Sequence, residues 1–329
     1  MKKHIFFSLF IFFVPIQAIN IDFDISMQLE HYQHILKKSQ SFTLWYYFFK
    51  ELYENNCKYF DIRETCFTNL SERCRGEKYH KCSGNSVCKI PKTLHFIWLG
   101  GRVPEEYEQY QRSWYKLHPD WQIVWWTDTP EQFNIEFILT SFSEVKKNKN
   151  KFIVVDTKKL IFDNKKFYDA ARNYGEKSDI LKWEIIYRCG GLYVDIDFEA
   201  LNPLDILHYC FDFYTGIQPL DTNIVQLGAA LFAARPDHPI LRTCVEGIEY
   251  NQHIQQIVLK TGPLHFTKSC IKALQKYTAE CGRCIALPAS FLYPCGYNQH
   301  GMPQSAWIKP ESFAVHQWAG SWLKPEAFE

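Results

Sequence analysis

The chain has 329 residues, 47% of them hydrophobic and 17% aromatic, which is enough for one large or two modest domains with a sizeable core. Its 37 basic and 36 acidic residues leave a formal net charge of only +1. This balance argues against a general nucleic-acid coat and against an acidic tail, so we expect no nucleic-acid partner.

The first 18 residues are predicted to be an export signal rather than part of the fold. Lys2 and Lys3 form a positive end, residues 5–16 are apolar, and residues 17–18 offer a cleavage point. The apolar stretch is shorter than the roughly 20 residues of a membrane-spanning helix, although an uncleaved signal anchor is an alternative. We expect an exported protein, secreted or lumenal, without a stable transmembrane span.

Residues 19–88 are predicted to form a helical, Cys-rich N-terminal segment. The stretch 21–56 contains no Gly or Pro, and its polar-aromatic character indicates helix. Five of the twelve cysteines lie within 57–88, and an even number of cysteines in an exported chain favours disulfides, whose pairing the sequence does not give. Cys281 and Cys284 have zinc-knuckle spacing, so zinc is an alternative there to disulfides or buried thiols.

An α/β domain with a mixed, mostly parallel sheet is predicted over 89–329, because apolar strands alternate with helical stretches from residue 89 onward. The first two strands are expected at 93–99 and 122–127, and the first is apolar on both faces, as a buried parallel strand is. Gly100 and Gly101 follow the first strand and would let backbone approach a ligand closely.

A helix over 179–189 is predicted to turn tightly into a strand. Ser178 suits the position before the helix, where its hydroxyl would accept an unpaired amide proton. Gly190 suits the left-handed residue that follows a helix. The strand is expected to run to Asp197, which would place Asp195 and Asp197 on one face, because residues two apart along a strand point the same way.

Two neighbouring carboxylates repel each other, so their placement is tolerable if a divalent cation lies beside them or if one stays protonated. Oxygen ligands favour Mn²⁺ or Mg²⁺, which leave coordination positions open for phosphate oxygens. His316, in FAVHQWAGSW, is the best candidate for a third ligand. Short surface strands also carry Asp-x-Asp, and a lone His in an apolar stretch is more often a core residue, so these residues alone leave both interpretations open.

Three motifs, in this order, resemble those of the glycosyltransferases with a DXD-containing sugar-binding region. That family includes the yeast Golgi initiating mannosyltransferase and the inositol-phosphoceramide mannosyltransferases, with the large clostridial glucosylating toxins as distant members. The motifs are IPKTLHFIWLGG at 90–101, SDILKWEIIYRCGGLYVDID at 178–197 and HQWAGSW at 316–322. The resemblance covers about 89–322, and the chain departs from it at Lys182, where Arg is commoner and would offer a bidentate fork instead of a point charge.

The resemblance implies a GT-A-like fold, a nucleotide-sugar donor and a Mn²⁺ or Mg²⁺ cofactor. It implies that the residues binding the donor are Ile97, Trp98, Asp179, Lys182, Tyr193, Asp195, Ser321 and Trp322. The implied metal ligands are Asp195, Asp197 and His316, and the implied catalytic residues are Asp179, Asp195 and Asp197. Asn223 and Gly262 look like residues of the family's acceptor side.

The implied activity is metal-dependent transfer of a hexose from a UDP- or GDP-sugar to a hydroxyl group, with retention at the anomeric carbon. The sequence does not choose between a glycan, a lipid and a protein as acceptor. Two alternatives stay open. One is a catalytically weak protein that binds a sugar nucleotide or glycan, and the other is a disulfide-stapled interaction protein in which residues 21–88 dock a partner.

Overall fold

The structure is a computed structural model that describes residues 88–133, 152–219, 226–299, 303 and 306–323. The predicted export signal, nearly all of the predicted Cys-rich segment, and Asn223 lie outside these residues. No helix in the described ranges is long and apolar enough to cross a bilayer.

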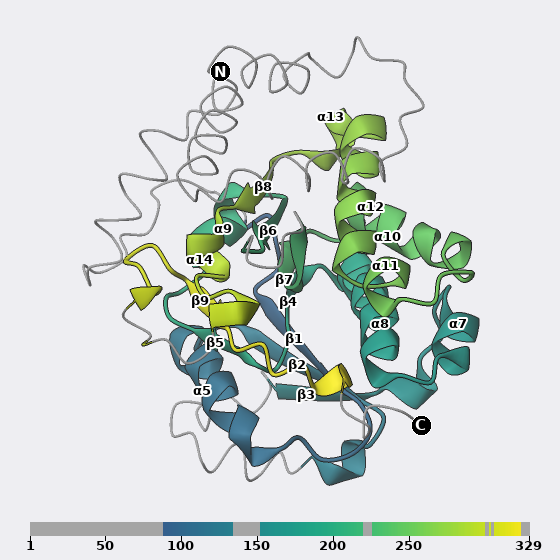
Figure 1. Ribbon diagram of the computed structural model, residues 1–329, viewed down its shortest axis with the longest axis horizontal. Coiled ribbons are helices and arrows are strands. Elements are labelled where there is room, and N and C mark those ends of the chain that lie inside the picture. Colours follow the sequence, from purple (N-terminus) through teal and green to yellow (C-terminus); the bar gives the residue numbers. More distant parts are fainter. Residues whose placement is uncertain (1–87, 134–151, 220–225, 300–302, 304–305, 324–329) are drawn as a thin grey trace.

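A seven-stranded sheet forms the centre of the molecule, with the strand order β3-β2-β1-β4-β7-β6-β8 (Figure 1). The strands are β1 (Thr93–Trp98), β2 (Gln122–Thr127), β3 (Phe152–Asp156), β4 (Gly191–Val194), β6 (Phe213–Ile217), β7 (Leu227–Ala234) and β8 (Cys284–Leu287). Strand β7 runs antiparallel to its neighbours β4 and β6, and all the other pairs are parallel. The expected α/β class with a mixed, mostly parallel sheet is therefore confirmed.

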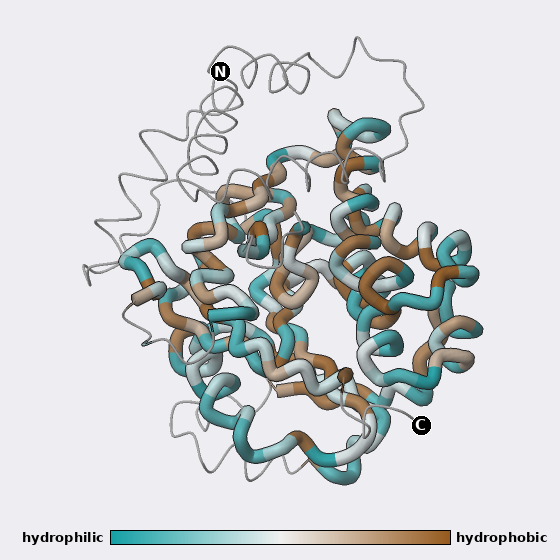
Figure 2. Tube along the Cα trace, viewed as in Figure 1, coloured by the Kyte–Doolittle hydropathy of each residue, from teal (hydrophilic) through white to brown (hydrophobic). Residues whose placement is uncertain are grey.

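Helices cover both faces of this sheet (Figure 1). They are α5 (Glu108–Leu117), α7 (Lys165–Ala170), α8 (Tyr174–Cys189), α9 (Asp205–Cys210), α10 (Pro239–Tyr250), α11 (Ile257–Lys260), α12 (Pro263–Lys276), α13 (Thr278–Cys281) and α14 (Ala289–Leu292). One core cluster joins the sheet to α5, α9 and α14, and a second joins it to α8, α10 and α12. Hydrophilic residues dominate α5 and the peripheral loops, whereas hydrophobic residues gather in the strands and inner helices (Figure 2).

The two predicted N-terminal strands are confirmed. Strand β2 has the expected bounds, and β1 ends one residue earlier than expected. Gly100 follows β1 with a φ of +84°, and its N–H donates to the Asp128 carboxylate at 2.9 Å. A Cβ on Gly100 would lie 2.4 Å from a ring carbon of Tyr174. The glycine is therefore needed both for its backbone conformation and because the start of α8 packs directly against it.

Helix α8 begins five residues earlier than the sequence predicts. Its N-cap is Asn173, whose Oδ1 accepts hydrogen bonds from the N–H groups of Gly175 and Glu176, so the prediction of Ser178 as the cap is wrong. Both residue types cap well, and Gly175 in the first turn concealed the true start. The predicted C-terminal end is confirmed, because the helix stops at Cys189 and Gly190 follows with a φ of +64°.

The strand that carries the two aspartates is shorter than predicted, because β4 ends at Val194. The Asp195 N–H still bonds to the carbonyl of Ala230 at 2.8 Å, and the Phe198 N–H then bonds to the carbonyl of Asp195 at 3.1 Å. Asp195–Asp197 is thus a turn, after which the chain leaves the main sheet as β5 (Phe198–Ala200) and pairs antiparallel with β9 (Ala314–His316). The strand-face argument for the two carboxylates is therefore wrong, and the turn brings them together instead.

Among the cysteines within the described residues, Cys88, Cys189, Cys244, Cys270, Cys281 and Cys284 are free thiols, and Cys244, Cys270 and Cys281 are buried. Cys284 Sγ lies 3.6 Å from His238 Nε2. No group of three or more potential metal ligands in the described part of the chain includes Cys281 or Cys284. The thiol interpretation therefore fits this pair better than the zinc interpretation.

Candidate active site

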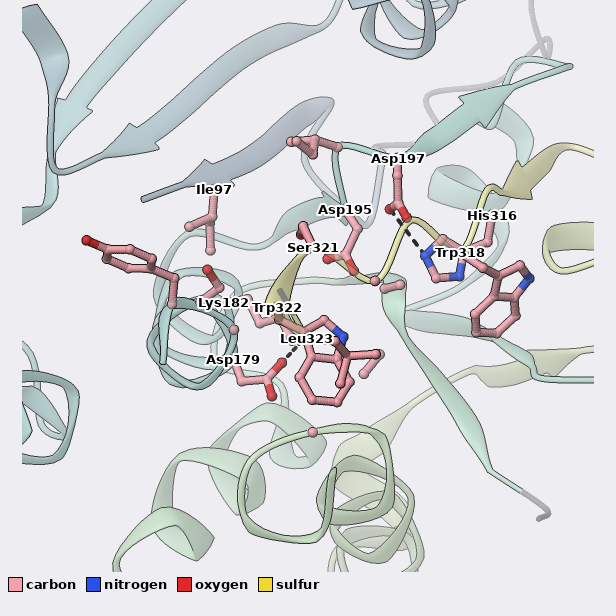
Figure 3. Close-up of a pocket in the computed structure, with 18 of the residues that line it drawn as sticks. Ile97, Asp179, Lys182, Asp195, Asp197, His316, Trp318, Ser321, Trp322 and Leu323 are labelled. Carbon is pink, nitrogen blue, oxygen red and sulfur yellow. Dashed lines mark ion pairs between the residues drawn. The ribbon is translucent and has the colours of Figure 1, made fainter. Parts of the chain in front are cut away.

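A cavity of about 620 Å³ opens at the carboxyl ends of β1 and β4, where open α/β sheets bind ligands (Figure 3). Its walls come from the end of β1, helix α8, the β4–β5 turn, the start of α12 and the C-terminal segment, residues 316–323. Every residue assigned to the site from sequence lines it except Asn223, which is outside the described residues. These lining residues are Ile97, Trp98, Asp179, Lys182, Tyr193, Asp195, Asp197, Gly262, His316, Ser321 and Trp322.

Three side chains in this cavity form a cluster suited to a metal ion. One ligand atom from each of Asp195, Asp197 and His316 lies within 4.8 Å of the others, and His316 Nε2 is 3.2 Å from Asp197 Oδ1 (Figure 3). The β5–β9 pairing brings them together, because its register sets His316 opposite Phe198, and the two rings stack with centroids 4.8 Å apart. Two carboxylates and an imidazole are a donor set that fits Mn²⁺.

The carboxyl groups of Asp195 and Asp197 differ in pKa. Burial raises the pKa of Asp195 to about 6; Lys182 opposes this shift and Asp197 adds to it. Burial also acts to raise the pKa of Asp197, but His316 and the N–H of Ala319 outweigh it, so this pKa lies below its ordinary value. The cluster therefore combines one carboxylate that is readily ionised with one whose charge is costly until a cation offsets it.

Five buried side-chain nitrogen or oxygen atoms within the described residues have no hydrogen-bond partner. Three of them, Trp98 Nε1, His316 Nδ1 and Gln226 Oε1, belong to residues that line the cavity. Burying a polar atom without a partner costs free energy. Because three of these five unpartnered atoms belong to residues that line one cavity, we expect a bound ligand to supply their missing hydrogen bonds.

On the opposite wall, a buried ion pair joins Asp179 and Lys182, with the ammonium group 2.6 Å from Asp179 Oδ1 (Figure 3). The hydroxyl of Thr261 donates to Asp179 Oδ2 at 3.0 Å, so both carboxylate oxygens have partners. A Cβ on Gly262 would lie 3.3 Å from the same Oδ2. The carboxylate is therefore held in one orientation at the cavity wall, and Gly262 leaves it room.

The C-terminal segment runs from the metal-ligand cluster to the start of α8. At one end, the N–H of Ala319 donates to Asp197 Oδ2 at 2.9 Å. At the other, Asn173 Nδ2 donates to the carbonyl of Trp322 at 2.9 Å. Sequence reasoning did not identify Asn173, although an Asn directly before a helical stretch is a signal for a cap. It also missed Gln226, for which the sequence offers no signal.

The comparisons with known proteins find glycosyltransferases. Residues 104–212 match the family described as glycosyltransferase sugar-binding region containing DXD motif. Inositol phosphoceramide mannosyltransferase 3 of Schizosaccharomyces pombe is 27% identical over 192 residues, which cover 56% of this chain and 46% of that protein. Uncharacterized glycosyltransferase L373 of Acanthamoeba polyphaga mimivirus is 22% identical over 242 residues, covering 71% of this chain and 84% of that protein.

Among solved structures, the PaToxG glycosyltransferase aligns with a TM-score of 0.44 and 18% identity, covering 56% of this chain and 69% of that one. The chain spans about half the length of the inositol phosphoceramide mannosyltransferases it matches. The family match includes the capped helix, both aspartates and the Gly-Gly-x-Tyr-x-Asp-x-Asp motif. Through this region the chain is similar to the DXD-containing sugar-binding-region glycosyltransferases.

Proposed function

We propose that this chain is a metal-dependent glycosyltransferase that moves a hexose from a UDP- or GDP-sugar to a hydroxyl group of a glycan, lipid or protein. The observation that carries the proposal is the convergence of Asp195, Asp197 and His316 in the same cavity as the paired Asp179 and Lys182. A metal cluster alone would fit many activities. Its position beside a fixed carboxylate suited to sugar hydroxyls favours sugar transfer.

The nucleoside is expected at the β1 side of the cavity. Trp98 is partly buried there, its ring centroid lies 6.0 Å from that of Tyr107, and its Nε1 has no partner. A base stacked on Trp98 would use the apolar face of the indole, with Ile97 beside it. The side chain is packed against its neighbours but its hydrogen bonding is incomplete, which favours a binding role over packing alone.

The diphosphate is expected at the β4–β5 turn, where Asp195, Asp197 and His316 would hold Mn²⁺ or Mg²⁺. When bound, the cation neutralises the charge of the diphosphate leaving group. Tyr193 keeps Asp195 oriented, since its hydroxyl donates to Asp195 Oδ1 at 2.6 Å. Ser321 and Trp322 would close over the diphosphate from the C-terminal segment.

Asp179 would hold the hydroxyls of the transferred sugar. Its carboxylate keeps acceptor capacity after bonding Lys182 and Thr261, and charge-assisted hydrogen bonds to sugar hydroxyls are strong and directional. Lys182 is buried beneath it with its ammonium 5.2 Å from the centre of the Tyr193 ring, so this cation also offsets the nearby carboxylates. Lys182 therefore supplies the positive charge that the commoner Arg would supply at this position.

Transfer is proposed to occur with retention by attack from the front face, with a phosphate oxygen taking the acceptor proton. The cavity carboxylates within the described residues are Glu106, Asp179, Asp195 and Asp197, and the last three already have assigned roles. Glu106 is exposed to solvent. A covalent glycosyl-enzyme trapped on any carboxylate would contradict this route.

The acceptor is proposed to enter past Gly262, and Asn223 is proposed to contribute to its binding. The S. pombe relative is named for mannosyl transfer to inositol phosphoceramide, so mannose and a ceramide lipid belong among the first substrates tested. We further propose that the protein acts after export, in a lumenal compartment or outside the cell that makes it, because its N-terminus has the pattern of an export signal.

The deciding experiment is a screen for metal-dependent hydrolysis of nucleotide sugars by the full chain. UDP-glucose, UDP-galactose, UDP-N-acetylglucosamine and GDP-mannose are incubated with Mn²⁺, and release of the nucleoside diphosphate is measured. We expect one donor to be hydrolysed, and we expect chelation of Mn²⁺ or the Asp197→Asn substitution to abolish the reaction. Binding of a donor without any turnover would instead favour the weak binding protein, and no binding of any donor would favour the interaction protein.

A further inference from the structure

The C-terminal segment is fastened to the start of α8 through the side chain of one buried residue, Asn173. This side chain is 3% exposed and uses both ends of its amide. Oδ1 accepts from the N–H groups of Gly175 at 2.8 Å and Glu176 at 3.2 Å, which caps the helix. Nδ2 donates to the carbonyl of Trp322 at 2.9 Å, which a helix cap does not require.

A second, independent feature shows that the two chain segments are built to touch at this point. A Cβ on Gly175 would lie 2.6 Å from the Cβ of Trp322 and 3.2 Å from its Cγ. The first turn of α8 therefore lacks a side chain where Trp322 packs against it. This close contact and the hydrogen bond from Asn173 fix the same residue of the C-terminal segment.

The fastened residues are part of the cavity wall, since Ser321 and Trp322 both line it. The segment is anchored at its other end on Asp197, through the N–H groups of Ala319 and Gln317. Trp318 and Gly320 have φ values of +53° and +60°, so the backbone between the two anchors turns sharply. With both ends fixed, the segment has one position relative to the metal-ligand cluster.

We propose that Asn173 is a positioning residue for donor binding, which holds Ser321 and Trp322 over the diphosphate through its Nδ2–H bond to the Trp322 carbonyl. The inference rests on the proposed function, because it assigns the held segment to the donor. It goes beyond that function by giving one amide two separable tasks. Oδ1 stabilises the helix, and Nδ2 sets the position of the cavity wall.

The Asn173→Asp substitution separates these tasks. Aspartate keeps the capping oxygen and suits the positive end of the helix, so the melting temperature should stay near that of the wild type. It removes the N–H donor to Trp322, and a carboxylate oxygen would repel the carbonyl. We expect the affinity for UDP or GDP in the presence of Mn²⁺, measured by calorimetry on the full chain, to fall about tenfold, as for one lost hydrogen bond.

Hydrogen exchange distinguishes a local loosening of the C-terminal segment from a general loss of stability. Amides of residues 317–323 should exchange faster in Asn173→Asp, while those of α8 keep their wild-type protection. Asn173→Ala removes both bonds, so it should lose protection in both places and lower the free energy of unfolding. If Asn173→Asp does not fold, Asn173→Ser keeps a capping oxygen without charge and takes its place.

Asn164→Asp is the matched control. Asn164 is also buried, and its Nδ2 also donates to a backbone carbonyl at 2.9 Å, that of Val245, but the residue does not line the cavity. It also donates to Glu184, which a carboxylate would repel, so this variant should lose stability yet keep wild-type nucleotide affinity in the folded protein.

The outcomes distinguish this inference from the proposed function. Equal nucleotide affinity in the wild type and Asn173→Asp would overturn the inference alone. So would an equal loss of affinity in Asn173→Asp and Asn164→Asp. Failure of the wild type to bind either nucleoside diphosphate with Mn²⁺ would overturn the proposed function and the donor role of Asn173 together, whatever the exchange data show.

Discussion

At the residue scale, Asp195 and Asp197 are neighbours in one turn yet differ in their ionisation. A sequence contains the spacing of two carboxylates but not their partners, so the expectation of a shared cation could be formed from sequence while the asymmetry could not. Asp197 gains His316 and the Ala319 N–H only when β5 pairs with β9. Asp195 has Lys182 and Tyr193 instead, and burial dominates its pKa.

This asymmetry predicts how Mn²⁺ binding depends on pH. The cation binds ionised carboxylates, and the pKa of Asp195 in the metal-free protein is about 6. Below that pH the cation must displace a proton, so the apparent Mn²⁺ affinity should fall, by about tenfold for each further pH unit. Calorimetric titrations on both sides of pH 6 test this. An affinity that does not change across this range would show that Asp195 is not a ligand.

Tyr193→Phe should move this pH dependence in a known direction. The Tyr193 hydroxyl donates to Asp195 Oδ1 at 2.6 Å and favours the ionised carboxylate, so its loss should raise the pKa of Asp195 further above its ordinary value. The pH at which Mn²⁺ binding weakens should therefore rise. Tyr214→Phe is a control at an equally buried tyrosine outside the cavity and should leave the profile unchanged. A downward shift in Tyr193→Phe would contradict the argument.

At the element scale, the helix–turn–strand unit from α8 to β4 carries the site, and the C-terminal end of its helix could be predicted from the sequence. Gly190 and Gly191 both have positive φ, at +64° and +99°, which is what the Gly-Gly pair predicts. The N-terminal boundary was not readable, because Asn173 and Ser178 are equally good caps by composition. The hydrogen bonds that Asn173 Oδ1 accepts from the N–H groups of Gly175 and Glu176 show that Asn173 starts the helix.

Gly190→Ala should destabilise the protein strongly, and Gly320→Ala much less. Both glycines have φ near +60°, but Gly190 combines it with a ψ of −167°, a conformation that essentially only glycine adopts, so the backbone strain of a side chain there is about 1–3 kcal/mol. A Cβ on Gly190 would also lie 2.8 Å from the Pro236 nitrogen and 3.0 Å from the Ala234 carbonyl oxygen, and this backbone does not move easily. A Cβ on Gly320 would meet nothing nearer than Leu323 Cδ1 at 3.5 Å.

We expect Gly190→Ala to lower the free energy of unfolding by about 1–3 kcal/mol more than Gly320→Ala, as overpacking does in a filled interior. Denaturant titration of both variants measures the difference. Equal losses would mean that the turn between α8 and β4 can shift, and that the position of the aspartates is less firmly set than the contacts indicate.

At the scale of the whole molecule, the sequence predicted the fold class and many of the residues that line the cavity, but not which distant segments pack together. Strands β1 and β2 and the helix–strand unit follow from local periodicity and turn residues. The second, two-stranded sheet does not, because β5 and β9 are three residues each and lie more than a hundred residues apart. Yet that small sheet delivers His316 to Asp197 and leads the C-terminal segment along the cavity.

The association between these segments explains why the family resemblance found residues that spacing alone could not. Asp179, Asp197 and Ser321 have no periodic relation in the sequence, and the cavity unites them only after α8, the β4–β5 turn and the C-terminal segment have packed. The acceptor side stays a prediction. Its predicted Asn223 lies outside the described residues, and Gly262 shows space beside Asp179 rather than a contact.

The central claim is that Asp195, Asp197 and His316 together hold a divalent cation. Its most direct test is the binding of Mn²⁺ to the purified full chain, followed by the electron paramagnetic resonance signal of the free ion, with and without UDP or GDP. We predict saturable binding that the nucleotide strengthens. Since losing a group that only orients a ligand costs about 10- to 100-fold in affinity, Asp197→Asn should lose at least about 100-fold. A wild-type protein that takes up no Mn²⁺ under any of these conditions, or an Asp197→Asn variant that binds it as well as the wild type, would contradict the claim.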